Sequence, residues 1–560
     1  MKTRVQLAVA STFLATAIAH HAAASQAPTT ERVSVATGGT QGNGDSYWAS
    51  ISADGRFVAF YSAASNFSSL QAIYVRDRTS GTTELVGPGL GYPSISSDGR
   101  FVAFTSGNNA MDVFLRDRVN GTTELVSVAT TGVSGSGTSD LFGSNAISDD
   151  GRFVVFVSFA SDLVVGDANQ FADIFVRDRS SGITELVSVA TGGGHGNGPS
   201  YWGSVSGDGR FVAFDSYASN LVAGDTNGKL DVFVRDLVNA TTERVSIDSA
   251  EAQGSKDSFN GSLSFDGRFV AFLSSSLLVA GDTNGHRDVF VRDRLNGTTE
   301  RASVSTSGVQ GSHDCRNASI SADGRWVVFE ALSPNLVAGD TNGAWDIFVH
   351  HLGSGTTDRV SLSSSGAEAN LKCFNASISG DGSFVAFDSA ASNLVTNDTN
   401  GYQDVFVRDR GPMPPDAYCT AGTTTHGCRA SIAASANPSV SLANPCNLSV
   451  SNVEGQKSGI LFYGNDNATF MPAPWAPSST SFLCVKPPTQ RTPIQDSGGT
   501  LNACDGSYLL DWNAYQSANP SALGNPWNVG GNVYVQAWFR DPPAPKSTNL
   551  SNAVEMTYVP

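Results

Sequence analysis

The sequence predicts an all-β protein in two parts, a closed ring of seven four-stranded sheets followed by a β-sandwich. Three observations lead to this prediction. One phrase recurs seven times, each copy consists of short strand-like runs and turns without a helical pattern, and the composition changes after the seventh copy. Self-similarity of this kind, at a period of 44–58 residues, is typical of a β-propeller.

Each copy is anchored by a Ser-x-Asp-Gly turn, whose Asp stands at Asp54, Asp98, Asp150, Asp208, Asp266, Asp323 and Asp381, 44, 52, 58, 58, 57 and 58 residues apart. In the fourth copy we expect strands at 204–206, 211–216, 231–236 and 242–245, because β-branched and aromatic residues gather there between Gly, Asn and Asp. The run from Phe211 to Phe214 is apolar throughout, as expected for a strand covered on both faces by neighbouring blades.

The seventh copy stops after its third strand, at Arg410. The missing phrase, Thr-Thr-Glu-Arg-Val-Ser-Val, stands ahead of the first copy, from Thr29 to Val35. We therefore predict that the N-terminal strand completes blade seven, so that the ring closes and no edge strand stays unpaired.

The turn phrase Ser-x-Asp-Gly-Arg-Phe-Val-Ala-Phe and the following Asp-Val-Phe-Val-Arg-Asp resemble the repeat of TolB-type, WD-like β-propellers over roughly residues 29–410. The resemblance implies a propeller fold. Propellers of this type include binding proteins, peptidase accessory domains and some polysaccharide lyases, so it implies no single chemistry.

Residues 1–24 carry Lys2 and Arg4, then an apolar Ala-rich run, then Ala22-Ala23-Ala24. This pattern predicts a cleaved secretory signal and an exported protein, located outside the cell, on its surface or in the periplasm. The propeller is expected over 25–410, a Pro-rich linker over 411–416 and the second domain over 417–560. No later apolar run is long enough to cross a membrane. We also expect the protein to be a monomer.

The charge balance limits the partners. The chain has 34 Lys and Arg against 51 Asp and Glu, a formal net charge of −17. Nucleic acid and anionic lipid need basic surfaces, so this balance argues against both.

Residues 417–560 contain strand-like runs at 448–453, 459–463, 481–485, 533–539 and 554–559, separated by loops rich in Pro, Gly and Ser. Short strands with turn residues between them predict a β-sandwich. The phrases at 453–457, 474–477, 504–507, 511–513 and 538–543 resemble a C-terminal module found after repeat domains in secreted bacterial proteins. That resemblance implies a role in adhesion, export or surface attachment at most.

The cysteines all lie in the C-terminal half, and their odd number, seven, leaves at least one unpaired within a monomer. Cys419 and Cys428 would close a tight loop and are the pair that the spacing favours for a disulfide. Cys315 and Cys373 occupy equivalent places in adjacent blades, either as a bridge or as two small packed thiols.

Several blades carry the loop Gly-Asp-Thr-Asn-Gly-x-x-Asp. Oxygen side chains at its positions one, three and seven resemble the spacing of calcium ligands, which makes calcium the candidate cofactor. The alternative is an Asx turn with an Asp that begins the next strand. The candidate ligands are Asp225, Asn227, Asp231, Asp282, Asn284, Asp288, Asp340, Asn342, Asp346, Asp398, Asn400 and Asp404.

A second set of loops delivers aromatic and charged side chains to the mouth of the central channel, on the face where propellers bind ligands. The set comprises Tyr47, Trp48, Tyr92, Tyr201, Trp202, Phe259, Arg316 and Phe374. Such side chains can stack on sugar rings or hold a peptide; the alternative is that they plug the channel.

Catalytic motifs such as His-Glu-x-x-His and Gly-x-Ser-x-Gly are absent from the sequence. The sequence therefore favours a non-catalytic protein that binds a glycan or a protein at the propeller face. The alternative is a polysaccharide lyase built on His195, His313, Arg316 and Tyr201, which would require these side chains to lie within reach of one another.

Overall fold

The computed structural model describes residues 27–107, 111–143, 145–167, 169–411, 416–418, 424, 426–438, 446–465, 473–474, 482–487, 489–524, 532–541 and 548–558. The chain divides into two compact units between Asp416 and Ala417. The expected secretory signal and the prolines of the expected linker lie outside the described residues. None of the described helices is long and apolar enough to cross a membrane.

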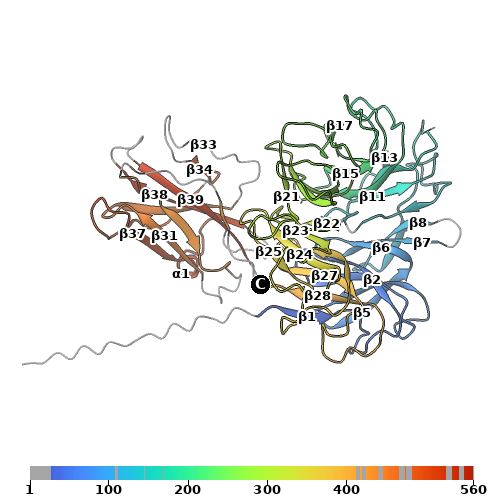
Figure 1. The fold of residues 1–560 in the computed structure, drawn as a ribbon, viewed down its shortest axis with the longest axis horizontal. Coiled ribbons are helices and arrows are strands. Elements are labelled where there is room, and N and C mark those ends of the chain that lie inside the picture. Colours follow the sequence, from blue (N-terminus) through green and yellow to red (C-terminus); the bar gives the residue numbers. More distant parts are fainter. Residues whose placement is uncertain are drawn as a thin grey trace, which may run out of the picture. The chain divides into compact units, whose positions relative to one another are not determined.

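The unit Ala27–Asp416 is a seven-bladed β-propeller, as the repeat predicts, and Figure 1 shows its blades. Each blade is a four-stranded antiparallel sheet, and in blades one to six the strands follow chain order. Blade one contains β2 (Ser46–Ile51), β3 (Phe57–Ser62), β4 (Ala72–Asp77) and β5 (Thr82–Pro88). Blade two contains β6 (Leu90–Ile95), β7 (Phe101–Ser106), β8 (Asp112–Asp117) and β9 (Thr122–Leu125). Blade three contains β10 (Ser139–Asp140), β11 (Phe153–Ser158), β12 (Asp173–Asp178) and β13 (Ile183–Leu186).

Blade four contains β14 (Ser200–Val205), β15 (Phe211–Ser216), β16 (Asp231–Asp236) and β17 (Thr241–Arg244). Blade five contains β18 (Ser258–Leu263), β19 (Phe269–Ser274), β20 (Asp288–Asp293) and β21 (Thr298–Arg301). Blade six contains β22 (Cys315–Ile320), β23 (Trp326–Ala331), β24 (Asp346–His351) and β25 (Thr357–Arg359). These bounds place the four strands of a copy close to where the sequence predicts them.

Blade seven joins the two ends of the repeat region. It contains β26 (Cys373–Ile378), β27 (Phe384–Ser389), β28 (Asp404–Asp409) and, as its outer strand, β1 (Thr29–Arg32). β1 runs antiparallel to β28, with Thr29 opposite Asp409 and Arg32 opposite Phe406, and Figure 1 shows blue β1 beside orange β28. The predicted closure by the N-terminal strand is confirmed.

The blades pack face to face through the apolar second and third strands. Val232 and Val234 of blade four share one buried cluster with Val270 and Phe272 of blade five. Within a blade, paired phenylalanines stack across these strands, as at Phe214 and Phe233, whose ring centroids lie 5.7 Å apart. Burial on both faces explains why these strands do not alternate apolar and polar residues.

The Ser-x-Asp-Gly-Arg turn is held by its own side chains. Asp208 Oδ1 accepts from Ser206 Oγ at 2.6 Å and from the backbone N–H of Arg210 at 3.0 Å, and Arg210 forms an ion pair with Asp236 at 2.7 Å. The guanidinium of Arg294, from blade five, lies 4.3 Å from the ring centroid of Phe211 in blade four. The repeated charges therefore serve the turn and the contact between blades.

The unit Ala417–Pro560 contains two main sheets around one core, the predicted β-sandwich. One sheet has the order β29 (Asp416–Tyr418), β39 (Thr548–Thr557), β38 (Asn532–Arg540), β32 (Ser458–Gly464) and β35 (Gln490–Arg491), with β36 (Gln495–Asp496) also paired to β32. The other has the order β30 (Ser431–Ala434), β31 (Asn447–Val453) and β37 (Gly506–Asp511). A small pair, β33 (Ala473–Pro474) and β34 (Phe482–Leu483), and the helix α1 (Trp512–Ala518) complete this unit. Trp512, Tyr463 and Phe539 lie in its core.

A disulfide joins Cys428 to Cys504. The predicted pair Cys419–Cys428 is therefore wrong. β30 and β37 both flank β31 antiparallel to it, so the segments that lead into β30 and β37 reach the same end of the sheet. Cys428 and Cys504 lie on these two segments, close in space and 76 residues apart in sequence.

Cys315 and Cys373 are free and buried, so they are two packed thiols and not a bridge. Each lies at the start of the first strand of its own blade, opposite Ala331 and Ser389. Blade four has a serine pair at this place, with Ser200 Oγ donating to Ser216 Oγ at 2.9 Å. The two thiols fill an intrablade position, which explains why they do not meet.

Replacing both Cys428 and Cys504 by Ser should destabilise the C-terminal unit by about 2–4 kcal/mol, because the bridge closes a loop of 76 residues in the unfolded chain. Thermal unfolding of the full chain under oxidising and reducing conditions measures the effect. Under oxidising conditions the variant should unfold at a lower temperature than the wild type does. An unchanged melting temperature would contradict a stabilising role for this bridge.

Candidate functional site

The first strand of most blades contains a β-bulge, where one residue takes the left-handed conformation. These residues are Trp48 (φ 58°), Trp202 (φ 52°), Asn260 (φ 60°), Asn317 (φ 44°) and Asn375 (φ 52°). Asn tolerates this region because its short polar side chain can bond locally, whereas a bulky residue there is a strained exception. Blades one and four therefore carry a tryptophan where blades five, six and seven carry the residue that the backbone favours.

The bulges surround a central cavity of about 580 Å³ to which all seven blades contribute. Trp48, Tyr92, Trp202, Phe259 and Phe374 supply aromatic surface from five different blades. Gly143, Asn260, Asn317, Asn375, Arg287, Arg316 and Glu330 also line it. A concave site with apolar rings and a few polar groups is the usual form of a ligand pocket.

Six of the eight side chains predicted for this mouth line the cavity, namely Trp48, Tyr92, Trp202, Phe259, Arg316 and Phe374. Tyr47 packs on Tyr61 and Trp48, and Tyr201 packs against the core shared by blades three and four. Both support the wall of the cavity from behind. The rings also contact each other in pairs, as at Trp48 and Tyr92, with centroids 5.0 Å apart, and at Phe142 and Trp202, 5.5 Å apart.

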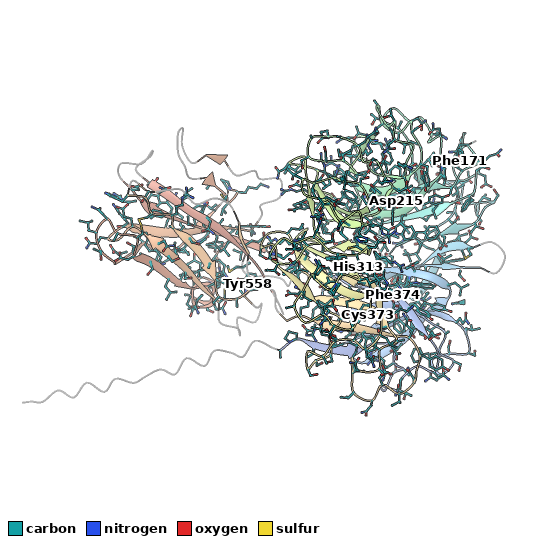
Figure 2. The ribbon with its side chains drawn as sticks, viewed as in Figure 1. Phe171, Asp215, His313, Cys373, Phe374 and Tyr558 are labelled. Carbon is teal, nitrogen blue, oxygen red and sulfur yellow. A yellow bond between two sulfur atoms is a disulfide. The ribbon has the colours of Figure 1, made fainter. Side chains whose placement is uncertain are left out.

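The structure does not gather the candidate catalytic residues into one cluster. Arg316 lines the cavity, whereas His195, His313 and Tyr201 do not. His313 stacks on His286, with ring centroids 5.8 Å apart. Figure 2 labels His313, Phe374 and Asp215. His195 lies in the connection between blades three and four, where it forms a β-bridge with Val189.

Three carboxyl groups lie behind the cavity at one repeated position, the residue before the last Ser or Ala of the second strand. Asp215 Oδ2 accepts the backbone N–H of Asn260 at 2.8 Å. Glu330 Oε1 accepts that of Asn375 at 2.6 Å, and Asp388 Oδ1 accepts that of Trp48 at 3.4 Å. Each carboxyl group thus holds the bulge of the next blade.

Burial disfavours the charged form of these groups. It raises the pKa of Glu330 to about 7 and that of Asp388 to about 7, and it raises the pKa of Asp215 well above its usual range. Sequence reasoning missed all three. The available clue was an acidic residue at a position where blades three and five have Val157 and Leu273.

The loops predicted to bind calcium contain an arginine. Arg244 Nη1 lies 3.1 Å from Asp225 Oδ1 and 3.5 Å from Asp231 Oδ2, and Asn227 Nδ2 donates to Asp231 Oδ2 at 2.7 Å. The same arrangement recurs in three further blades, formed by Arg301 with Asp282, Asn284 and Asp288, by Arg359 with Asp340, Asn342 and Asp346, and by Arg32 with Asp398, Asn400 and Asp404.

The guanidinium supplies the positive charge that the sequence interpretation assigned to calcium. The described residues contain no group of three or more His, Cys, Asp or Glu side chains arranged to hold a metal ion. Calcium binding at these loops stays a prediction, and the arginines explain the paired carboxylates without it.

A larger hollow, of about 1000 Å³, lies on the connections around blades six and seven, lined by Ser305, Asn335, Arg359, Leu362 and Glu368 among others. Its charged side chains pair with each other, Arg359 Nη2 lying 2.9 Å from Glu368 Oε1. It also has none of the aromatic rings that line the central cavity. The central cavity is therefore the better candidate site.

No protein-family model matches the chain, and no curated protein matches its sequence. Solved structures do match. One is an oligogalacturonate lyase in complex with manganese, with 14% identity over 69% of this chain and 94% of that chain and a TM-score of 0.45. The likeness is one of fold.

A second match is the β-propeller domain of the Trilobed protease from Pyrococcus furiosus, with 12% identity over 65% of this chain and 95% of that chain and a TM-score of 0.41. A third is TolB from Acinetobacter baumannii, with 17% identity over 56% of this chain and 62% of that chain and a TM-score of 0.32. The β-propeller itself rests on the strand pairing. The resemblance of residues 417–560 to a module of secreted proteins stays a prediction.

Proposed function

We propose that this chain is an exported, non-catalytic binding protein that holds a glycan in the central cavity of its propeller. The support is a cavity lined by five aromatic rings, with asparagine, arginine and glutamate side chains among them. Aromatic faces bury the apolar faces of sugar rings, and the polar groups orient the hydroxyls. The disulfide Cys428–Cys504 accords with export, since such bonds persist in oxidising compartments.

One observation carries the proposal, namely the two tryptophans in the left-handed region. A non-glycine residue in this conformation costs about 1–2 kcal/mol, and residues so placed cluster at ligand sites. Trp48 and Trp202 adopt this conformation at positions where the other bulges have asparagine, which tolerates it better, at Asn260, Asn317 and Asn375. Both indole rings line the cavity, so the strain places flat apolar surface where a ligand would lie.

Binding is favoured over lyase chemistry because the carboxyl group on the cavity wall already has partners. Glu330 accepts hydrogen bonds from the backbone N–H of Asn375 at 2.6 Å and from Asn317 Nδ2 at 3.2 Å. A general base must present a lone pair to the substrate. Glu330 Oε1 is instead engaged by Asn317 of its own blade and by the backbone of Asn375 in the next.

The test replaces Trp48 and Trp202 by Asn, singly and together. Asn is the residue that three other blades have at this position, so the backbone should be kept while the rings are removed. We expect each variant to weaken glycan binding at least about tenfold, as for truncation of a buried aromatic contact residue. Tryptophan fluorescence and calorimetric titration against a panel of soluble neutral and acidic polysaccharides measure this.

The matched control is Phe159→Ser, which removes an exposed ring on the same side of the propeller but outside the cavity. It should bind as the wild type does. Absence of binding across the whole panel would overturn the proposal and favour a protein ligand. Bound glycan that gains ultraviolet absorbance with time would favour the lyase.

A further inference from the structure

Two arginines on one side of the cavity form no ion pair within the described residues. Arg316 lines the cavity from β22, is exposed, and forms no ion pair within the described residues. Its guanidinium lies 4.3 Å from the ring centroid of Trp345. Arg287 lines the same cavity and donates from Nε to the backbone carbonyl of Cys315, the residue before Arg316, at 2.7 Å. Neither guanidinium is bonded to a carboxylate, although Glu330 lies opposite Arg316 across the strand pair and Asp314 accepts the backbone N–H of Arg287 at 3.0 Å.

This arrangement departs from the rest of the propeller. Arginines of the turns and of the fourth strands are paired with carboxylates, as in Arg210–Asp236 and Arg244–Asp225. The only acidic residue among those that line the cavity is Glu330, and its burial raises its pKa to about 7. In a chain of net charge −17, the cavity lining thus carries two arginines against one carboxyl group.

The wall of loops around the cavity is interrupted at one place. Thirteen residues connect the outer strand of one blade to the first strand of the next in six of the seven connections, at 33–45, 126–138, 187–199, 245–257, 302–314 and 360–372. Each of these connections folds into a small hairpin closed by a β-bridge. Between blades one and two, Gly89 alone joins β5 to β6.

The hairpins are tied to the loops on both sides, which makes the wall continuous elsewhere. In the connection between blades four and five, Gly254 O accepts from Asn227 Nδ2 of blade four at 3.1 Å. In the connection between blades five and six, the backbone N–H of Ser312 donates to Asn335 Oδ1 of blade six at 3.0 Å. The gap before blade two leaves Leu90 exposed beside Tyr92 of the cavity. In a ring of seven, the blades farthest from blade two are five and six, which carry Arg287 and Arg316.

We propose that the cavity holds the acidic end of a linear saccharide, with its anionic group between Arg287 and Arg316 and the rest of the chain leaving through the gap between blades one and two. The inference rests on the proposed glycan-binding function. Guanidinium groups suit this task because their planar N–H donors match the oxygens of a carboxylate or a sulfate. The aromatic rings between the two ends stack on the intervening sugars.

The first test compares charged and neutral forms of the same chains, by calorimetric titration of the full protein. The probes are oligosaccharides of glucuronate, galacturonate and mannuronate, their carboxyl-reduced counterparts, and sulfated neutral chains as a separate arm that distinguishes sulfate from carboxylate. We expect binding of the acidic members, loss on carboxyl reduction, and affinity weakened about 10- to 100-fold in Arg316→Gln, as for a lost charged hydrogen bond.

The matched control is Lys256→Gln, which removes one positive charge from an exposed position in the connection between blades four and five, away from the cavity. It should bind as the wild type does. Equal binding of acidic and reduced chains, unaffected by Arg316→Gln, would overturn this inference and leave the proposed function standing. Binding of no saccharide at all would overturn both.

The second test concerns the gap. Replacing Gly89 by residues 245–257 would give blade two the hairpin that the other connections have. We expect the graft to keep the affinity of the wild type for acidic disaccharides and to lose the additional affinity for longer chains. In the wild type itself, affinity should rise with chain length beyond what the cavity holds. Affinity independent of length, or long chains bound equally by the graft, would overturn the exit route.

Discussion

Deleting residues 29–37 should open the propeller ring and cost at least about 5 kcal/mol of its free energy of unfolding. The deletion removes β1 and, with it, the pairing of Thr29 to Arg32 with β28. It also removes Val33, which is fully buried in the cluster shared by blades one and seven and contributes about 1.5–3 kcal/mol.

The larger part of the cost comes from Asp404. Its Oδ1 accepts from Ser34 Oγ at 2.6 Å, and its Oδ2 lies 3.1 Å from Arg32 Nη1. Both partners lie in the deleted segment. A buried carboxylate that loses its ion-pair partner, and here keeps only the amide of Asn400, costs about 3–5 kcal/mol, which is comparable with the whole stability of many domains. The exposed edge of β28 would also become a site for aggregation.

Calorimetric unfolding of the full chain and amide hydrogen exchange of Val405, Phe406 and Val407 on β28 measure the opening. The variant should unfold at a much lower temperature and lose protection at these amides first. A synthetic peptide of residues 27–37 added in trans should restore part of the stability, and a scrambled peptide should not. A variant that keeps the wild-type melting temperature would show that the ring does not depend on its N-terminal strand.

The repeat was enough to predict the ring because each copy carries its own turn. The phrase around Asp208 marks the turn between the first and second strands of a blade, and its seven copies give the number of blades. Closure of the ring could be predicted because the fourth-strand phrase is missing after Arg410 and stands instead at Thr29. The sandwich followed from strand-like runs that the structure places in β31, β32, β38 and β39.

Features that depend on contacts between blades were not predictable. Asn375 lies 45 residues after Glu330, and no local pattern connects the backbone N–H of the one to the carboxylate of the other. The left-handed conformation of Trp48 likewise follows from a bulge that the sequence hides, because tryptophan is a poor residue for it. The pairing of Cys428 with Cys504 depends on the order of strands in a sheet, which spacing alone does not give.

The arginines of the acidic loops were predictable in principle. The blades whose loops carry the complete Gly/Asn-Asp-Thr-Asn-Gly phrase have Arg in the fourth strand, at Arg32, Arg244, Arg301 and Arg359. The first three blades have Leu85, Leu125 and Leu186 there, and they lack the complete phrase. This covariation between two parts of the repeat indicates a contact, and the structure shows it as an ion pair.

Glu330→Gln and Asp388→Asn should make the propeller more stable at pH 8 and should change its stability little at pH 4. Burial raises the pKa of each carboxyl group to about 7, from 4.5 for Glu and 3.8 for Asp. Between these values and pH 7 the folded state binds more protons than the unfolded state, so the free energy of unfolding falls as the pH rises. The contribution of these two carboxyl groups to stability is fully present below about pH 4 and is lost as the pH rises through 7.

At about 1.4 kcal/mol for each pKa unit, each group should account for about 3–4 kcal/mol between these limits. Unfolding of the wild type and of the two variants, measured at pH 4, 5, 6, 7 and 8, gives the comparison. The amides remain able to accept the backbone N–H groups of Asn375 and Trp48, so the bulges keep their partners.

Glu185→Gln, at an exposed position on β13, is the matched control and should keep the pH dependence of the wild type. Both variants lose one negative charge from a chain that carries an excess of negative charge. The difference between the pH dependence of Glu185→Gln and that of Glu330→Gln therefore measures the effect of burial. If Glu330→Gln and Asp388→Asn unfold at pH 8 as readily as the wild type does, the two carboxylates are charged in the folded protein without penalty. The cavity wall would then carry negative charge beside Arg316, and its preference for an anionic ligand would be correspondingly weaker.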